Sequence, residues 1–485
     1  MSARREGGAL AIVLHTHMPY VEGFGTWPFG EEWLWEAIAS CYLPLLDLLD
    51  AGAPLTLSLT PVLCDQLEAP GVFERFSAFV EGVRRETHEE DAAGLRAAGH
   101  ERLAQELERS WREYADALEA MRRRDGDLLA SLARHAQWTS SSTHAVLPLL
   151  ATDAGVRLQV RSGIAAHRRR FGAGWRGGFW LPECAYAPSL DRALEDAGVA
   201  AVCVELTGRF GLGAREHLHP IAGDAGVLLV PIDRSTISLV WSERGYPASG
   251  AYRDYHHHTV HHHNPWSNDG RAYDHTAALA LAREHAKDFV ARALARLRDA
   301  HETAASGPSR AGAARGGLLV CALDTELLGH WWYEGLEWLR AVVQECASQG
   351  LELLRLDDAL QALEPTPASD AQGWQASTWG SEGDLSTWSG PAVAEMAFAA
   401  RAAELAVLAA GAQASDAAVR ELLALQASDW PFMVSRGIAV PYARERFDGH
   451  RRRLERALAD GAPVDAASLR NLGAHAERAC LLDPS

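Results

Sequence analysis

In this sequence, acidic and imidazole side chains repeatedly follow short runs of apolar residues, and in one case the polar run Thr139–Thr143, at the points where buried strands would end. These strand-end residues are His15, His17, His144, Glu183, Asp324, Glu326 and His330. Parallel α/β proteins bind their ligands at the carboxyl ends of the strands. We therefore expect these side chains to meet in one active site.

Two kinds of chemistry suit a cluster of this composition. In the first, His15, His17, Asp324 and His330 would hold a zinc ion for metal-assisted hydrolysis. In the second, two carboxylates would flank the glycosidic bond of a sugar chain, and the histidines would bind sugar hydroxyls. Tryptophans beside the same strand ends favour the second chemistry, because their rings can stack on sugar rings. These tryptophans are Trp180, Trp331 and Trp332.

Continuous apolar runs predict the strands that would position these residues. The runs are Leu10–Leu14, Leu55–Leu59, Phe179–Leu181, Ala200–Val204, Val227–Pro231, Leu318–Leu323 and Leu351–Leu354. Apolar runs without polar alternation are typical of strands that are buried on both faces of a parallel sheet. Because helical stretches separate the runs, we expect an α/β fold, either an open sheet or a barrel.

Two parts of the chain are predicted to be helical throughout. Residues 73–135 are charged, rich in alanine and poor in β-branched residues, as in a long helix or a helical hairpin. The chain after about Gly390 is again rich in alanine and leucine, which predicts a C-terminal helical domain. Residues 301–317 and 363–373 are predicted to be a surface loop and a linker.

Length, charge and cysteine usage narrow the class of protein. A chain of 485 residues fits two or three domains, or one large barrel with insertions. Its formal charge of −18 disfavours nucleic acid and anionic membrane surfaces as partners, but not a neutral substrate. The seven cysteines contain no CxxC pair, and we recognise neither a signal peptide nor an apolar run of about 18 residues. We therefore expect a cytoplasmic monomer without membrane spans.

Five motifs, in this order along the chain, resemble those of glycoside hydrolase family 57. They are HTHMPY (15–20), WTSSSTH (138–144), GGFWLPECAY (177–186), ALDTELLGHWWYEG (322–335) and STWGSEGDLSTW (377–388). The segment ASDWPF (427–432) in the helical C-terminal part also fits the pattern. Among the members of the family, the 1,4-α-glucan branching enzymes are the most similar.

The resemblance implies a particular architecture. Residues 1–72 and 136–362 are expected to form a distorted (β/α)7 barrel, into which residues 73–135 are inserted as a helical unit. Residues 374–485 are expected to form an all-helical domain that completes the cleft. The resemblance implies neither a metal ion nor an organic cofactor.

The resemblance also implies a retaining mechanism, with Glu183 as the nucleophile and Asp324 as the general acid/base. Such a pair of carboxyl groups lies about 5–5.5 Å apart, so we expect the two residues on neighbouring strand ends. Asp324 must be protonated to act as an acid, so burial near tryptophan should raise its pKa. Glu183 must stay ionised to attack the sugar.

The expected substrate is an α-1,4-glucan of the amylose or glycogen kind. By resemblance, the histidines would line the site of the attacked glucose, while tryptophans and the segment around Asp429 would form the outer wall. The substrate-binding residues predicted in this way are His15, His17, His144, Trp180, Trp332, Trp379, Trp388, Asp429 and Trp430.

The sequence does not decide whether water or a sugar hydroxyl releases the covalent intermediate. Branching enzymes of the family are described as shielding it from water with a tyrosine on a mobile loop. No tyrosine lies between Tyr186 and Tyr246, where residues 208–226 are the expected loop. An α-glucan hydrolase (amylase) or a 4-α-glucanotransferase is therefore the first alternative. A metal-dependent hydrolase or deacetylase and a silent glucan-binding protein are alternatives of other classes.

A second unusual feature is a histidine cluster in the short stretch 251–274. Six of the eight residues 256–263 are histidines. Such a cluster could hold a metal ion or could belong to a solvated, partly ordered loop at the edge of the cleft. We favour the loop.

Overall fold

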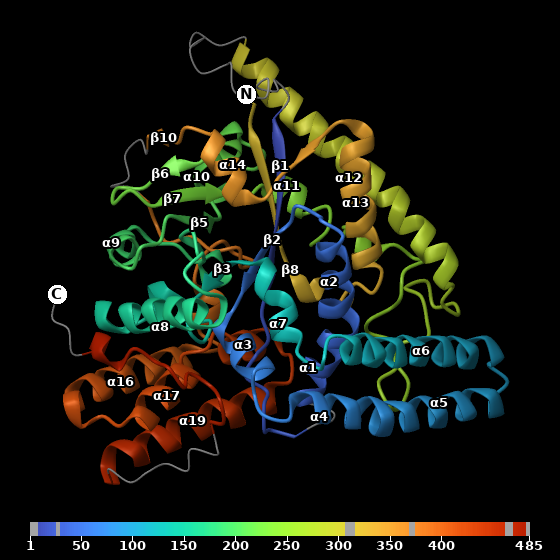
Figure 1. Ribbon diagram of the computed structural model, residues 1–485, viewed down its shortest axis with the longest axis horizontal. Helices are drawn as coiled ribbons and strands as arrows, with labels where there is room; N and C mark the ends of the chain where they lie inside the picture. Colours follow the sequence, from blue (N-terminus) through green and yellow to red (C-terminus); the bar gives the residue numbers. More distant parts are fainter. Residues whose placement is uncertain (1–7, 26–29, 306–315, 368–373, 461–468, 482–485) are drawn as a thin grey trace.

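A sheet forms the centre of the computed structural model, which describes residues 8–25, 30–305, 316–367, 374–460 and 469–481 (Figure 1). Within these residues, seven parallel strands lie in the order β7–β5–β4–β3–β2–β1–β8. They are β1 (Ala9–Thr16), β2 (Thr56–Leu59), β3 (Ala136–Ser140), β4 (Gly178–Trp180), β5 (Ala201–Val204), β7 (Leu228–Pro231) and β8 (Leu318–Asp324). The short strands are β6 (Ile221–Ala222), β9 (Glu352–Leu353) and β10 (Thr366–Pro367).

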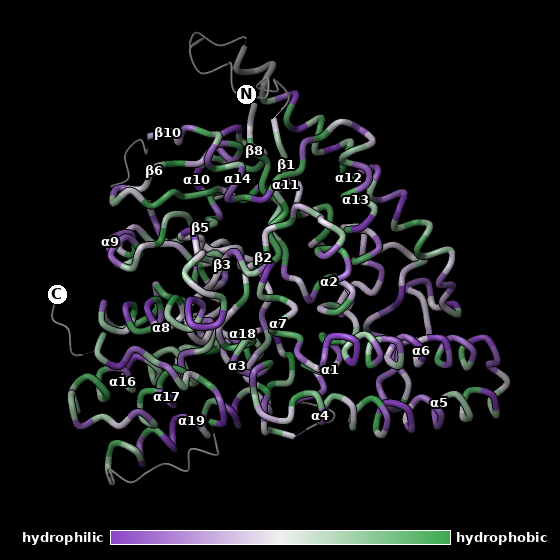
Figure 2. Tube along the Cα trace, in the orientation of Figure 1, coloured by the Kyte–Doolittle hydropathy of each residue, from purple (hydrophilic) through white to green (hydrophobic). Residues whose placement is uncertain are grey.

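The two edges of the seven-stranded sheet approach each other without forming a full ladder. The N–H of Asp233, just after β7, donates to the carbonyl of Val320 on β8 over 2.9 Å. The predicted distorted (β/α)7 barrel is thereby confirmed, with an incomplete closure between β7 and β8. Leu10–Leu14 of β1 are fully buried, and Figure 2 shows the central strands as largely hydrophobic. Burial of such runs drives the sheet to the middle of the molecule.

Strand β3 has no apolar run, and its only signal in the sequence is the polar run Thr139–Thr143, which overlaps the end of the strand. Its polar side chains are buried because other strands and helices satisfy them. Ser140 Oγ donates to the carbonyl of Trp180 over 2.8 Å, and the side chain of Gln137 accepts from the N–H of Leu57 over 2.9 Å. These partners exist only in the folded sheet, so the strand has little signal of its own.

Helices connect the strands and cover the sheet. They are α1 (Glu31–Ala37), α2 (Leu43–Asp50), α3 (Pro61–Leu67), α7 (Leu128–Leu132), α8 (Asp153–Phe171), α9 (Asp191–Asp196), α10 (Thr207–Phe210), α11 (Arg234–Ile237), α12 (His275–Ala305), α13 (Gly335–Gln349) and α14 (Leu356–Ala362). Because α12 continues to Ala305, the predicted loop 301–317 is helical at its start. The rest of that loop, residues 306–315, and residues 368–373 of the predicted linker lie outside the described residues.

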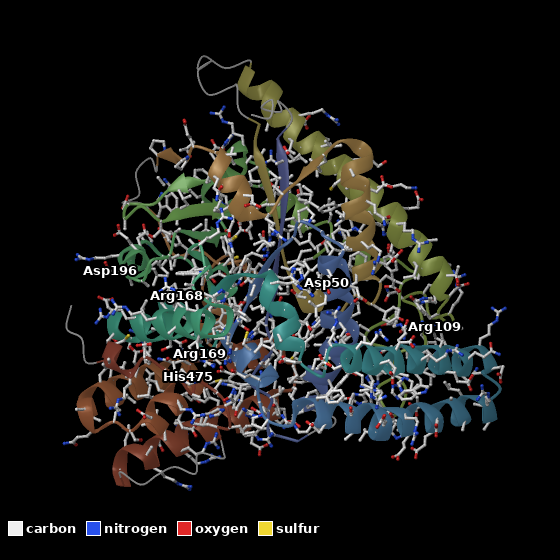
Figure 3. All side chains as sticks on the ribbon, in the orientation of Figure 1. Asp50, Arg109, Arg168, Arg169, Asp196 and His475 are labelled. Carbon is white, nitrogen blue, oxygen red and sulfur yellow. The ribbon has the colours of Figure 1, made fainter. Side chains whose placement is uncertain are left out.

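The predicted helical insertion is a hairpin that projects to one side of the barrel (Figure 1). It consists of α4 (Val72–Ala78), a π-helical turn, α5 (Arg85–Ala97) and α6 (Glu101–Arg123). Charged contacts attach it to the barrel. The labels in Figure 3 mark two of the residues involved, Arg109 on α6 and Asp50 on α2. Arg109 donates to the hydroxyl of Tyr333 over 2.8 Å, and Asp50 accepts from Arg124 over 3.1 Å.

The C-terminal part of the chain is helical, as the sequence predicts. It contains α15 (Ser386–Ser389), α16 (Ala394–Ala410), α17 (Asp416–Leu425), α18 (Asp429–Arg436) and α19 (Val440–Asp460). Its apolar core includes Tyr20, Val62 and Leu158 from the barrel, so these helices are packed firmly against it. The exact boundaries of the three predicted domains stay predictions. Within the described residues, no helix combines the length and the apolar character that a membrane span requires.

Candidate active site

A cleft of about 1310 Å³ opens at the carboxyl ends of the strands. It brings together side chains from β1, β4, β8 and the C-terminal helices, which are distant in sequence. Eight of the eleven site residues predicted from the sequence line it: His15, His17, His144, Glu183, Asp324, Trp379, Trp388 and Asp429.

The other three predicted site residues lie behind the wall of the cleft. Trp180 and Trp430 are fully buried, and Trp332 is 2% exposed. Trp180 stacks on the ring of His15 with a centroid distance of 4.7 Å, and so supports a residue that does line the cleft. The expectation that these tryptophans touch substrate is therefore replaced by a supporting position. The exposed tryptophan of the WW pair is Trp331, at 39%.

Glu183 is held at the floor of the cleft by an unusual backbone. Its φ is 61°, and Cys184 follows with a φ of 49°. Left-handed conformations cost energy for residues other than glycine and are concentrated at functional sites. Two donors hold the carboxylate: Trp379 Nε1–H to Oε2 at 3.0 Å and Ser428 Oγ–H to Oε1 at 3.2 Å.

The environments of Glu183 and Asp324 raise the pKa of both carboxyl groups. Burial raises the pKa of Glu183 to about 7, and the bonds from Trp379 and Ser428 limit that rise. Burial, followed by the negative charges of Glu183 and Glu326, raises the pKa of Asp324 well above its usual value. Glu183 therefore becomes ionised near neutral pH, and burial with the neighbouring negative charges favours the protonated form of Asp324 that an acid requires.

One geometric expectation is wrong: Glu183 and Asp324 do not come from neighbouring strand ends. Three strands, β3, β2 and β1, lie between β4 and β8 in the sheet. The curvature of the incomplete barrel brings the two ends to face each other across its mouth, where both line the cleft and their charges interact. His15 occupies the strand next to Asp324 and is its register partner.

A chain of hydrogen bonds connects two imidazoles to Glu183. His15 Nε2 lies 2.9 Å from His144 Nε2, and His144 Nδ1 lies 2.8 Å from Ser428 Oγ. An ionised Glu183 can only accept, so Ser428 donates to it and accepts from His144 Nδ1–H. His144 Nε2 must then accept from His15 Nε2–H. Burial lowers the pKa of both histidines well below the usual value, which keeps them neutral as this chain requires.

We expect the Ser428→Ala variant to shift the acid limb of the pH profile of kcat/KM to higher pH. Glu183 must be ionised, and its pKa rises when a donor to the carboxylate is lost, so activity disappears at a higher pH on acidification. At pH 7 the loss should be roughly ten-fold, as for one charge-assisted hydrogen bond. Trp379→Phe should shift the limb in the same direction. An unmoved limb in both variants would contradict the assigned bonds.

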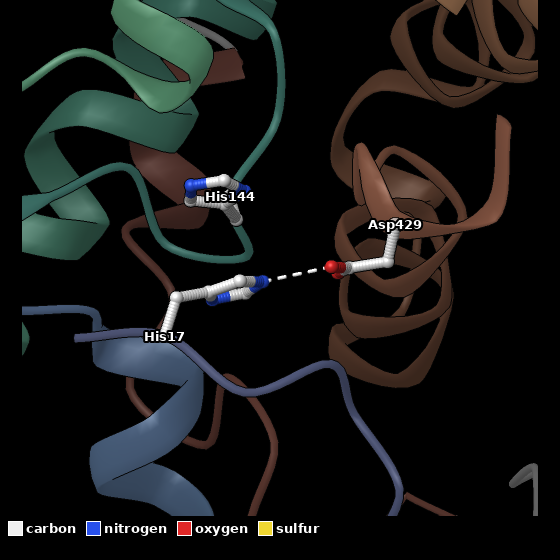
Figure 4. Close-up of side chains that lie close together, drawn as sticks. All are labelled: His17, His144 and Asp429. Atoms are coloured by element: carbon white, nitrogen blue, oxygen red, sulfur yellow. Dashed lines mark hydrogen bonds and ion pairs between the residues drawn. The ribbon is translucent and has the colours of Figure 1, made fainter. Parts of the chain in front are cut away.

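The other imidazole of the site, His17, forms an ion pair with Asp429 of α18 (Figure 4). Their side chains lie 2.8 Å apart. Burial opposes a charge on His17, but Asp429 outweighs it and the pKa of His17 is raised. The ring of His17 also stacks on His144 at a centroid distance of 3.9 Å. Asp429 therefore attaches the C-terminal helices to the floor of the cleft.

His17, His144 and Asp429 are also a group whose ligand atoms lie within 4.8 Å of one another, as a metal site requires. Both ring nitrogens of His144 already have partners, His15 and Ser428, so a metal ion would have to break one of these bonds. The group fits the hydrogen-bond network better, and we derive no step through a metal ion. His330 was one of the four zinc ligands considered from the sequence. Its Nδ1 atom lies 3.7 Å from a carboxylate oxygen of Glu36.

Several residues that line or support the cleft were not singled out as site residues from the sequence. Ser428 directly precedes the predicted Asp429, but a serine alone carries no signal. Tyr255 lines the cleft from the histidine-rich stretch, whereas no residue of the expected loop 208–226 does. That segment instead packs against the apolar cores of the molecule through Phe210 and Leu218. Arg234 and Trp241 also line the cleft.

Comparison with known proteins finds relatives along nearly the whole chain. A 1,4-α-glucan branching enzyme of Thermococcus kodakarensis is 30% identical, over 93% of this chain and 73% of that protein. A probable 1,4-α-glucan branching enzyme of Mycobacterium tuberculosis is 33% identical, over 93% and 91%. The crystal structure of a branching enzyme from Pyrococcus horikoshii superposes with a TM-score of 0.86 at 28% identity, covering 99% of this chain and 97% of that one.

The fold and the cleft define an enzyme of the incomplete-barrel α/β class, with half-buried acidic side chains at the carboxyl ends of its strands. The profile of glycosyl hydrolase family 57 matches residues 137–371, and that of the C-terminal region of 1,4-α-glucan branching enzymes matches residues 391–477. The chain belongs to glycosyl hydrolase family 57.

Proposed function

We propose that this chain is a 1,4-α-glucan branching enzyme of glycogen-type glucan metabolism. Such an enzyme cleaves an α-1,4 bond and transfers the cleaved chain to a 6-hydroxyl. The observation that carries the proposal is the similarity to branching enzymes over 93% of the chain, which includes both the barrel and the C-terminal helices. The cleft supports it with two half-buried carboxyl groups whose pKa values are both raised.

In the first step, we infer that the carboxylate of Glu183 attacks C1 of the glucose at the bond to be cleaved. The bond between C1 and the glycosidic oxygen breaks, and Asp324 gives its proton to that oxygen, so the leaving chain departs with a new 4-hydroxyl. The hydrogen bond that Trp379 Nε1–H donates to the carboxylate holds Glu183 in position. The product is a glucosyl ester on Glu183 with inverted configuration at C1.

In the second step, the ionised Asp324 accepts the proton of the 6-hydroxyl of an acceptor chain. The oxygen of that hydroxyl attacks C1, and the ester bond to Glu183 breaks. Two inversions leave an α-1,6 bond and restore both carboxyl groups. Water in place of the sugar hydroxyl would give hydrolysis, so exclusion of water decides the product.

We further infer that the enzyme works as a cytoplasmic monomer. All seven cysteines are free and buried, and burial raises the pKa of thiols such as Cys203, which keeps them unreactive. Free thiols in this number suit a reducing compartment. The net charge of −18 opposes association between copies of the chain.

The proposal is tested by incubating the protein with amylose and following iodine staining together with reducing ends. A branching enzyme should lower and blue-shift the iodine absorbance, because branches shorten the helical segments, with few new reducing ends. A fall in absorbance matched by new reducing ends would instead identify an α-glucan hydrolase. A redistribution of chain lengths with unchanged reducing ends and without new α-1,6 linkages would indicate a 4-α-glucanotransferase.

A further inference from the structure

The cleft has an arm that the proposed chemistry at Glu183 does not use. It runs from Asp324, past the turn that follows β8, to the histidine-rich loop, which we define as residues 251–274. Cleft residues of the loop include Tyr255, His256, His258 and His262. In Figure 1 this yellow-green loop descends from α12 towards the hairpin of α5 and α6.

The turn after β8 connects Asp324 to this arm. Gly329 has a φ of 108°, and a side chain there would lie 2.1 Å from the carbonyl oxygen of Ser40. This close approach directs His330 and Trp331 into the cleft, where they line it. Tyr255 packs against Trp331 with ring centroids 4.5 Å apart. The pair forms an aromatic surface of the kind on which a sugar ring stacks.

The histidine-rich loop is well anchored, contrary to the expected partial order. His263 is buried between Thr87 Oγ1, at 3.1 Å, and the guanidinium of Arg84, at 3.2 Å. His261 Nδ1 binds Asp91 at 2.8 Å. His257 stacks on the ring of Trp266 with a centroid distance of 3.9 Å. His257, His261 and His263 therefore hold the loop in place. His256, His258 and His262 line the cleft, and the buried His263 borders it as well.

The wall that these residues form carries little free charge. The guanidinium of Arg84 is paired with both Glu32 and Glu36 beneath it. Burial lowers the pKa of His262 and of His330, so their rings are neutral. A neutral imidazole offers one donor and one acceptor, which matches a sugar hydroxyl. Rings for stacking and neutral polar edges together suit an uncharged carbohydrate better than an anion or a cation.

The chemistry of the transfer step indicates which sugar chain belongs there. The same carboxyl group, Asp324, gives a proton to the leaving chain and later takes one from the acceptor. The acceptor must therefore occupy the side of the cleft on which Asp324 lies. Glu183, by contrast, is held by Trp379 and Ser428 on the side of the C-terminal helices. The arm of the histidine-rich loop is on the Asp324 side, because His330 and Trp331 belong to the same turn.

We propose that the histidine-rich loop, with Trp331, is the binding site for the acceptor α-glucan chain. This inference rests on the proposed transfer function. A chain held there presents its hydroxyl to Asp324 and occupies space that water would otherwise fill. The loop thus favours transfer over hydrolysis without touching the covalent intermediate itself.

The test is the variant His256→Ala/His258→Ala/His262→Ala, assayed on amylose with added maltohexaose as acceptor. We expect the KM for maltohexaose to rise and the ratio of transfer products to new reducing ends to fall, each roughly ten-fold, as for the loss of several hydroxyl contacts. The rate of donor cleavage should fall much less than the rate of transfer, because the leaving chain meets Asp324 on the same side of the cleft but is also held by the donor contacts at Glu183. The double variant His100→Ala/His475→Ala, which removes two exposed histidines outside the cleft, should behave like the wild type.

Two results would overturn the inference. An unchanged ratio and an unchanged KM would show that the acceptor does not contact the loop. A proportional fall of cleavage and transfer would place the loop on the donor side or assign it to stability. A Trp331→Ala variant tests the inference independently, and we expect the ratio of transfer products to new reducing ends to fall in the same way. A wild type that hydrolyses without any transfer would overturn the proposed function as well, so the two failures are distinguishable.

Discussion

The Glu183→Gln variant is expected to lose glucan turnover by roughly 10⁴- to 10⁶-fold, as other covalent enzymes do when the nucleophile is removed. Glutamine keeps the shape of the side chain but cannot form the glucosyl ester. Turnover is measured as the rate at which the iodine absorbance of amylose decreases. Binding of maltohexaose, measured by calorimetry, should be retained, because the stacking rings and the histidines are unchanged.

A second variant distinguishes a lost nucleophile from a damaged fold. In Glu183→Ala, azide can occupy the vacated space and attack C1 directly. We expect azide to restore cleavage of an α-maltosyl fluoride and to give the β-glycosyl azide, because only one inversion occurs. An α-azide product, or full turnover by Glu183→Gln, would contradict the assignment of the nucleophile.

The Asp324→Asn variant is expected to lose turnover of amylose by about 10²- to 10⁴-fold, the usual contribution of general acid/base catalysis. An amide cannot give a proton to the leaving oxygen or take one from the acceptor. Cleavage of an α-glycosyl fluoride should suffer much less, because fluoride leaves without a proton. The ratio of the two rates is the measurement.

Azide again provides the control. In Asp324→Ala the covalent intermediate still forms on Glu183, and azide should release it as the α-glycosyl azide after two inversions. The opposite product stereochemistry of the two alanine variants identifies each role separately. Equal losses on amylose and on the fluoride would point to a positioning role for Asp324 and contradict its assignment as the acid.

The site was predictable from the sequence where it depends on strand ends. Glu183 and Asp324 follow strands with apolar runs, and parallel strands deliver such residues to one face of the barrel. The same logic placed His15 and His17 in the cleft. The polar strand β3 was indicated only in part, by the run Thr139–Thr143, because its side chains find partners only after the sheet has formed, as Ser140 does with Trp180.

Other features depend on geometry that spacing does not contain. Which ring of the Trp331 and Trp332 pair faces the cleft is decided by the turn at Gly329, whose φ of 108° is a tertiary property. Ser428 acts through a hydroxyl, a group too common to be singled out in a sequence. The ends of β4 and β8 face each other across the mouth of the barrel because the sheet is curved. The order of the strands along the sequence does not reveal this curvature.

The central claim is that Glu183 and Asp324 transfer a glucan chain to a 6-hydroxyl. The most direct measurement is the number of new α-1,6 linkages per new reducing end formed from amylose, counted by ¹H NMR of the anomeric protons. We expect this ratio to be well above one for the wild type and no linkages for Glu183→Gln. New reducing ends without α-1,6 linkages in the wild type would contradict the account.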